Sequence, residues 1–222
     1  MGDKSMPKKT TMIRAKKKGT VREYAEAFII AFIIALLIRT FLVQAFKIPS
    51  SSMEPTLLVG DHILVSKFIY GIRIPYIGAK FLTFHKPKRG DIVVFVYPED
   101  PKKDFIKRVI ATGGEEVQIK DRKIFINGKI IEDPWGVYRE RDGPLVPSHF
   151  RPRDNYGPRP VPSNSLFVMG DNRDNSQDSR YWGFVDLSAV KGKAFIIYFS
   201  YNKKAMEVLD KVRWTRFGKL LR

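Results

Sequence analysis

An apolar segment near the N-terminus constrains the fold of this chain more than any other feature. Residues 27–38 are twelve apolar residues in succession, and the apolar pattern resumes after Thr40 and continues to Phe46. Twenty helical residues extend over about 30 Å, which is the thickness of the hydrocarbon core of a bilayer. Arg39 interrupts the pattern, so its long side chain would need to reach the membrane interface. We therefore expect a transmembrane anchor over residues 23–46.

Charge predicts how this anchor is oriented. The chain has a net charge of +17, and residues 1–22 carry eight Lys or Arg against one acid. Basic residues next to a transmembrane helix favour the cytoplasmic side, so residues 1–22 are expected to be a cytoplasmic segment and everything after residue 46 to lie outside. A second basic segment, residues 203–222, holds seven Lys or Arg against two acids. Two basic end segments of this kind are at least as compatible with binding to an anionic membrane surface as with binding to nucleic acid.

Two other interpretations of the apolar segment are a cleaved signal peptide and a buried core helix. A signal peptide has a basic region, an apolar region and a small-residue cleavage site, which Val43-Gln44-Ala45 loosely resembles. Arg39 interrupts the apolar region, however, and Val43 is larger than the residue usually found three positions before a cut. These features favour an uncleaved anchor.

The rest of the chain predicts a mainly antiparallel β fold. Short runs rich in β-branched and aromatic residues are separated by turn residues, and Asn127-Gly128 is a strong hairpin signal. We expect strands at 61–65, 91–97, 105–110, 117–119, 123–126, 130–131, 166–169 and 194–199. The expected organisation is a β core from residues 47–114 and 163–202, a β-hairpin and Pro/Gly-rich extension at 115–162, and a basic amphipathic tail at 203–222 with a short helix.

The residue types limit the chemistry that this core can perform. The chain has no cysteine, which excludes thiol nucleophiles and thiolate metal sites, and His62, His85 and His149 have no ligand-like spacing. We therefore expect no metal and no cofactor. A hydrolase on this scaffold would use a serine with histidine or lysine as base. Lysine works as a base near neutral pH only when burial lowers its pKa by several units.

Lys107 is the candidate base, because it is a cation inside a predicted strand. Alternation places it on one face with Phe105 and Val109. The commoner alternative for a strand lysine is a solvated edge position. Three serines at residues 50–52 follow the anchor, between two prolines, and they are either a polar linker or a source of a nucleophile.

Residues 170–183 are the densest polar stretch of the chain. Asp and Asn side chains there are expected to bond backbone amides, and Arg–Asp pairs to fix the shape of the loop. A Ca²⁺ loop is the alternative. The acids do not have the spacing of an EF-hand, and Arg173 and Arg180 would repel a cation.

Four motifs in this sequence are similar to those of bacterial type I signal peptidases (leader peptidases). Residues 50–56, SSSMEPT, resemble the S-x-S-M-x-P-T box of that family, and residues 89–95, RGDIVVF, resemble its R-G-D-I-V-V-F box. Residues 107–115 resemble the K-R-x-x-G-x-x-G-D box, with Glu115 where Asp is usual. Residues 170–183 resemble the G-D-N-R-x-N-S-x-D-S-R-x-x-G box. Many relatives have two transmembrane helices, whereas one is expected here.

The resemblance implies a role for each matching side chain. Ser52 matches the nucleophile and Lys107 the general base. Ser176 matches the hydroxyl that orients the base. Ser50 matches the hydroxyl of the oxyanion hole, where it acts with the backbone N–H of Ser52.

Further residues match the surroundings of that site. Asp178 and Arg180 match a structural ion pair. The apolar lining of the substrate cleft, where a peptide binds as an added strand, is matched by Phe46, Ile48, Met53, Leu57, Ile63, Val94, Phe105 and Ile106. The family fold, an antiparallel β catalytic core with a smaller β extension, agrees with the strands expected from the sequence.

The resemblance implies a membrane-bound serine endopeptidase that removes signal peptides from exported preproteins. The expected cut follows small residues at −1 and −3 and proceeds through an acyl-enzyme. The expected partners are such preproteins and the phospholipid bilayer, with no nucleic acid. The expected location is the bacterial inner membrane, crossed once, with the catalytic domain on the periplasmic side.

Two alternatives belong to other classes. A self-cleaving serine–lysine protease of the repressor type would need a DNA-binding helix-turn-helix at the N-terminus, where this chain has an apolar segment. A basic nucleic-acid or membrane-surface binder would spread its charge over a folded face, whereas here the charge lies at the ends.

Overall fold

The computed structural model describes residues 20–70, 72–73, 80–81, 85–139, 152–207 and 209–221. His149 and most of the basic N-terminal segment lie outside these residues. The chain divides into one unit of residues 1–38 and a second of residues 39–222, and each is considered by itself.

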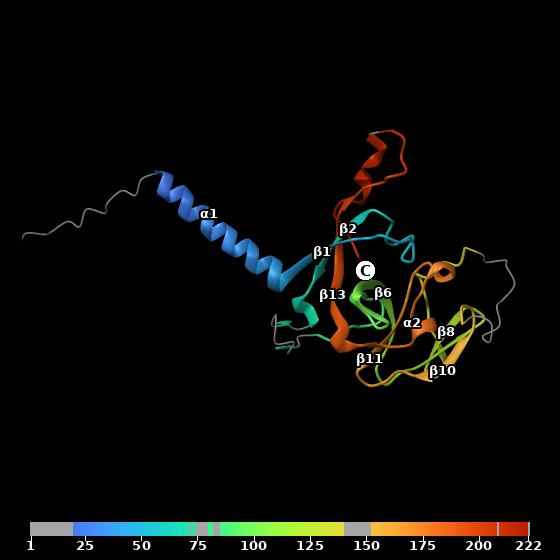
Figure 1. Ribbon diagram of the computed structural model, residues 1–222. Coiled ribbons are helices and arrows are strands. Elements are labelled where there is room, and N and C mark those ends of the chain that lie inside the picture. The colour runs from blue at the N-terminus through green and yellow to red at the C-terminus, as the bar shows by residue number, and fades with distance from the viewer. Residues whose placement is uncertain are drawn as a thin grey trace, which may run out of the picture. The chain divides into compact units, whose positions relative to one another are not determined.

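Helix α1, Thr20–Leu37, is the helix of the first unit (Figure 1). It carries Glu23 in its first turn, where a carboxylate stabilises the helix N-terminus. None of its side chains is buried. Across the described residues, no helix combines the length and the apolar character that crossing a bilayer requires.

The expected continuous helix over residues 23–46 is wrong in its second half. The α-helix ends at Leu37, a wider helical turn follows at Ile38–Leu42 (η1), and strand β1 occupies Val43–Lys47. Strand β1 pairs with β2, so that Val43 lies opposite Ser66 and Lys47 opposite His62. In this pairing the backbone N–H and C=O groups of residues 43–47 form hydrogen bonds with β2 instead of within a helix. The apolar pattern alone therefore overestimates the length of the helix. The transmembrane anchor and the topology inferred from it are therefore not supported.

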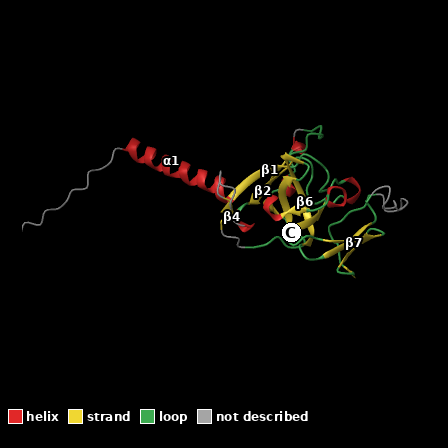
Figure 2. Ribbon diagram, turned by 60° about the horizontal axis from the view of Figure 1, so that its bottom comes forward, coloured by secondary structure: helices red, strands yellow, loops and turns green. Residues whose placement is uncertain are grey.

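The main sheet contains eight strands, all paired antiparallel. Their order is β1-β2-β13-β5-β6-β11-β12, and β14 pairs with β13. The strands appear in Figures 1 and 2. Their bounds are β1 Val43–Lys47, β2 Asp61–Ser66, β5 Ile92–Tyr97, β6 Asp100–Thr112, β11 Ser165–Met169, β12 Val185–Asp186, β13 Val190–Ser200 and β14 Lys219–Leu220.

A second, four-stranded sheet forms from residues inserted between β6 and β11. Its order is β10-β7-β8-β9. The hairpin expected at Asn127-Gly128 is present, because both residues adopt positive φ, 51° and 73°, as a tight turn requires. The bounds are β7 Glu116–Lys120, β8 Lys123–Ile126, β9 Lys129–Ile130 and β10 Tyr156–Pro160. A short pair, β3 Ile72–Arg73 with β4 Lys80–Phe81, is separate from both sheets. The mainly antiparallel β fold expected from the sequence is confirmed.

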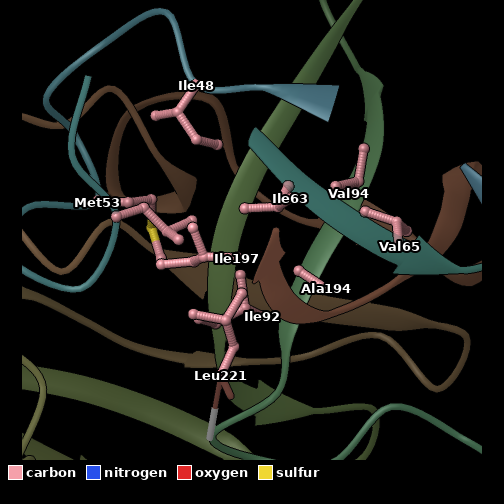
Figure 3. Packing of buried hydrophobic residues seen from close by; sticks show 10 residues of the cluster. Ile48, Met53, Ile63, Val65, Ile92, Val94, Ala194, Ile197 and Leu221 are labelled. Atoms are coloured by element: carbon pink, nitrogen blue, oxygen red, sulfur yellow. The ribbon is translucent and has the colours of Figure 1, made fainter. Parts of the chain in front are cut away.

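Strand β5 is buried on both faces because its side chains alternate between two cores. Ile92 and Val94 belong to one cluster, while Val93 and Phe95 belong to another. Figure 3 shows the first of these clusters at close range. Its buried members are Ile48, Met53, Leu57, Ile63, Val65, Ile92, Val94, Ala194, Ile197 and Leu221.

The C-terminal segment differs from the amphipathic helix expected there. Over 203–207 and 209–221 the structure has short 3₁₀ turns, Leu209–Lys211 (η5) and Trp214–Arg216 (η6), followed by β14. Tertiary contacts explain the difference. The Arg216 guanidinium reaches the buried carboxylate of Asp61, with Nε 3.0 Å from Oδ1, and Leu221 packs into the first core. A continuous helix would not deliver both contacts.

Candidate active site

Ser52 and Lys107 meet in the interior of the second unit. Ser52 lies in the irregular segment between β1 and β2, and Lys107 lies within β6 opposite Val93. The Lys107 Nζ donates a hydrogen bond of 2.7 Å to the Ser52 Oγ. The two residues are 8% and 4% exposed, respectively. A hydroxyl and an amine thus form a direct, nearly dry contact.

Burial lowers the pKa of Lys107 from 10.5 to about 8. The cause is desolvation, since the apolar surroundings disfavour the ammonium form. The charges of Asp178 and Asp171 raise the pKa, and that of Arg180 lowers it. Alternation along β6 places Lys107 beside Phe105 as expected, with Nζ 5.4 Å from the ring centre. The solvated-edge alternative for this lysine is therefore wrong.

The loop that begins at Gly170 fixes the backbone around Ser52. The Asn172 backbone N–H donates to the Ser52 carbonyl oxygen at 3.1 Å, and the Asn172 amide donates to the Ser51 carbonyl oxygen at 3.1 Å. The Asn175 amide donates to the Ser51 Oγ at 2.9 Å. Two consecutive peptide groups at the serine are therefore anchored by one neighbouring loop.

That loop is held in turn by a buried ion pair between Asp178 and Arg180. The guanidinium donates to the carboxylate at 2.8 and 2.9 Å, and neither side chain is exposed. The carboxylate also accepts the Gly170 N–H at 3.0 Å. Burial opposes ionisation of Asp178, but the Arg180 charge and these hydrogen bonds outweigh it and lower its pKa. Arg180 further donates to the Arg173 carbonyl oxygen at 2.7 Å.

A second buried ion pair joins the strand of Lys107 to the same loop. Arg108 points to the opposite face of β6 and donates to both carboxylate oxygens of Asp171, at 2.8 and 2.7 Å. Its guanidinium lies 4.5 Å from the ring centre of Trp135. The Thr56 hydroxyl donates to Asp171 at 2.5 Å, which links the serine segment to the pair. The Arg108–Asp171 pair thus connects the strand of Lys107, the segment of Ser52 and the loop that begins at Gly170.

A cleft of about 380 Å³ opens over the Ser52–Lys107 contact. It is lined by Pro49, Ser50, Ser51, Ser52, Asp104, Phe105, Ile106, Lys107, Asn175 and Gln177. Within the described residues, no cluster of three or more His, Cys, Asp or Glu is arranged to hold a metal ion. Neither His62 nor His85 lines the cleft. His62 instead packs edge-on against Tyr198 and Phe199. Of the described titratable bases, lysine alone contacts the serine hydroxyl.

Comparison with known proteins identifies the family. The family model described as "Signal peptidase, peptidase S26" matches residues 21–199. A signal peptidase I from Pseudomonas fluorescens is 38% identical over 94% of this chain and 83% of the relative. One from Aquifex aeolicus is 37% identical over 81% of this chain and 84% of the relative.

The chain belongs to the signal peptidase family, peptidase S26. It is therefore an enzyme, a serine endopeptidase of that family. The crystal structure of a signal peptidase I from Enterococcus faecalis is 31% identical, covers 49% of this chain and 97% of that chain, and has a TM-score of 0.41.

Among the described residues, two serines expected at the site make no hydrogen bond with Lys107. The Ser176 hydroxyl is buried and makes no hydrogen bond of ordinary geometry among the described residues, but it interacts with the Asp178 carboxylate and helps lower the pKa of that group. It lies against Gly170, where an added Cβ would be 2.3 Å from the Ser176 Oγ. Ser50 is exposed and lines the cleft beside Ser52. The base-orienting and oxyanion roles of these two serines remain predictions.

The eight apolar residues expected to line the signal peptidase cleft divide into two groups. Phe105 and Ile106 line it. Five others are buried members of the core cluster that Figure 3 shows, and Phe46 packs against that cluster. Those five are Ile48, Met53, Leu57, Ile63 and Val94. In this structure they lie in the core, and none of them lines the cleft.

Sequence reasoning missed Arg108, Asp171 and Asn172 as parts of the site. Side-chain alternation along the predicted strand indicated the pair of Arg108 and Asp171. Alternation puts Arg108 opposite Lys107 on a strand with buried neighbours, and a buried guanidinium needs a carboxylate partner. No signal in the sequence singles out Asn172 among the polar residues of its loop, because its contacts are made to a segment more than 100 positions away.

Proposed function

We propose that this chain removes signal peptides from exported preproteins, with Ser52 as nucleophile and Lys107 as general base. The observation that carries the proposal is the 2.7 Å contact between the Lys107 Nζ and the Ser52 Oγ in a buried setting. Membership of the peptidase S26 family and the relatives that are signal peptidases I support the substrate class. The lowered pKa supports the role of the lysine as a base.

The reaction begins when neutral Lys107 accepts the Ser52 hydroxyl proton. Ser52 Oγ forms a bond to the scissile carbonyl carbon, and the carbonyl oxygen becomes an oxyanion facing the Ser50 hydroxyl and the Ser52 backbone N–H. The C–N bond breaks as the protonated Lys107 gives its proton to the leaving amine. An ester joins Ser52 to the signal peptide. Lys107 then deprotonates a water molecule, which attacks the ester carbon. The ester C–O bond breaks as Lys107 returns this proton to the Ser52 Oγ, which releases the signal peptide and restores the serine.

The cleft favours a narrow, extended substrate. Phe105 and Ile106 line it together with the serine segment. An extended peptide that lies along this cleft would place alternate side chains against the protein. We propose that small residues at −1 and −3 are selected because those two side chains face the wall next to Ser52.

Helix α1 supplies a surface for lipid. Its exposed side chains include Phe28, Ile29, Phe32 and Ile33, which are unfavourable in water over so long a stretch. We propose that these side chains contact a bacterial membrane. Flotation of the full chain with phospholipid vesicles, compared with a Phe28→Asp, Ile33→Asp variant, tests this, and equal flotation of both would contradict it.

The experiment for the main proposal uses the detergent-solubilised full chain and a preprotein with an Ala-x-Ala site. We expect one cut, directly after the second alanine, with the product ends identified by mass spectrometry. Ser52→Ala and Lys107→Ala should each give no product while retaining the wild-type unfolding midpoint to within a few degrees. Cleavage by the folded Ser52→Ala variant would show that another residue is the nucleophile.

A further inference from the structure

A second and larger hollow lies next to the catalytic cleft. It has a volume of about 1040 Å³, and Pro49 and Ser51 line both this hollow and the cleft. Both hollows therefore border the segment that carries Ser52. We call the larger hollow the basic groove, because its lining contains the five cations Lys47, Arg139, Lys203, Lys204 and Arg213.

The positive charge of the basic groove is largely uncompensated. Five cations and one carboxylate, Glu54, line it, which gives a formal net charge of +4 with His62 neutral. Glu54 is already paired with Arg139. Arg213 is held by the Val59 carbonyl oxygen at 3.1 Å and the Ser200 Oγ at 3.2 Å, neither of which is charged.

Three lysines of the groove have no ion pair with any described carboxylate, namely Lys47, Lys203 and Lys204. All three are exposed. They come from different parts of the chain, one from the end of β1 and two from the segment after β13. The fold thus gathers separate cations around one hollow beside the nucleophile, rather than displaying a single basic run.

The cut divides the substrate of the proposed reaction into two parts. The part before the cut is a signal peptide, with a basic region and an apolar region. Its basic region would be repelled by the groove, and its apolar region would gain nothing from lysine ammonium groups. The part after the cut is the start of the exported protein. That part passes Ser52 and can continue over Pro49 and Ser51 into the groove.

We propose that the basic groove binds the first residues after the cut and selects for acidic side chains there. This inference rests on the proposed function and adds a specificity determinant to it. The ammonium groups of Lys203 and Lys204 attract these acidic side chains, and Lys47, at the end of β1, adds to this attraction. Because these cations act on binding at a distance from the reacting bond, their effect falls mainly on KM.

The test uses synthetic peptides that share one signal sequence and one Ala-x-Ala site. Residues +3 to +6 are all aspartate in one peptide, asparagine in a second and lysine in a third. For the wild-type full chain we expect kcat/KM to be at least about fivefold higher for the aspartate peptide than for the lysine peptide, with the asparagine peptide between them. In 1 M salt this difference should largely disappear, because the Debye length falls to about 3 Å.

A charge-reversal variant, Lys203→Glu with Lys204→Glu, should abolish or invert the order of the three peptides. The matched control is Lys123→Glu with Lys129→Glu, which makes the same change in net charge at exposed positions of the four-stranded sheet. The control should keep the wild-type order. The control variant should also cleave the asparagine peptide with a kcat close to that of wild type.

Three results would overturn the inference, and they differ from a failure of the proposed function. Equal cleavage of the three peptides by wild type at low salt would do so, as would equal effects of the two charge-reversal variants. An unchanged order of the three peptides in Lys203→Glu, Lys204→Glu would do so too. If that variant also cosedimented less than wild type with phosphatidylglycerol vesicles, the groove would be a site for lipid phosphate. If wild type cleaved none of the peptides, the proposed function itself would be wrong.

Discussion

The amine of Lys107 lies 2.7 Å from the hydroxyl of Ser52, although 55 positions separate the two residues in the chain. Both are buried, and the lysine has a pKa near 8 because its charged form is desolvated. A contact this short is productive only when the amine is neutral and accepts the hydroxyl proton. The protonation state of one lysine is therefore expected to control the activity.

Activity should rise with pH and reach half of its plateau at about pH 8. With a pKa of about 8, about one lysine in ten is neutral at pH 7, and nearly all are neutral at pH 10. The measurement is kcat/KM for a signal-peptide substrate between pH 6 and 10. Lys107→Arg should be as inactive as Lys107→Ala, because a guanidinium does not deprotonate in this range.

Histidine variants are the control for that pH profile. Joint replacement of His62, His85 and His149 should leave the midpoint near pH 8 in place. An activity limb near pH 6.5 that vanishes in this variant would assign the base to histidine and contradict the serine–lysine mechanism.

The three consecutive serines should differ sharply in their sensitivity to alanine. Ser52→Ala should abolish turnover. Ser50→Ala should lower kcat by roughly 10²–10³ through loss of an oxyanion donor, whereas Ser51→Ala loses one exposed hydrogen bond from Asn175 and should be nearly silent. Steady-state kinetics with one peptide substrate measures all three. Equal losses in Ser51→Ala and Ser52→Ala would show that the nucleophile is wrongly assigned.

The Asp178–Arg180 ion pair should set the position of the pH profile. Asp178 raises the pKa of Lys107 and Arg180 lowers it. Asp178→Asn is therefore expected to move the activity midpoint to lower pH, and Arg180→Gln to higher pH. Each leaves a buried charge unpaired, which should lower the free energy of unfolding by about 3–5 kcal/mol.

An exposed ion pair on β6, the strand of Lys107, provides the comparison. Asp100→Asn breaks the pair with Lys103 near the start of β6 and should leave the midpoint unchanged. Shifts of the same sign in Asp178→Asn and Arg180→Gln would mean that the pair acts by holding the loop rather than through its charges.

Gly170→Ala should lower kcat by displacing the nucleophile. A Cβ at this position would lie 2.4 Å from the Ser52 carbonyl oxygen, which is backbone and has no rotamer to adopt. A displacement of about 1 Å at the reacting group lowers the rate by about 10²-fold. We expect that loss in kcat, measured on protein that remains folded by circular dichroism.

Gly128→Ala is the matched control for the glycine substitution. Gly128 has a φ of +73° and open space around it, far along the chain in the hairpin of the small sheet. This change should cost about 1–2 kcal/mol of stability from the left-handed backbone conformation and leave kcat unchanged. A normal kcat in Gly170→Ala would show that the serine segment can relax.

Local pattern in the sequence determined the β fold and much of the site. The alternating β-branched runs became strands, Asn127-Gly128 became the expected turn, and four motifs indicated the family that the comparisons confirm. Alternation along β6 also placed Lys107 beside Phe105. These features depend on neighbours in the chain, since side-chain period and turn geometry are set within a few residues.

Contacts between distant segments decided what the sequence could not. Residues 43–46 are apolar enough to continue a helix, but pairing with β2 makes them a strand. The segment around Arg216 does not form the expected continuous helix, because Arg216 pairs with the buried carboxylate of Asp61. The depressed pKa of Lys107 and the anchoring of Ser52 by Asn172 exist only after β6 and the loop from Gly170 enclose them. Desolvation and ion pairing depend on the whole surrounding volume, which no local stretch of sequence specifies.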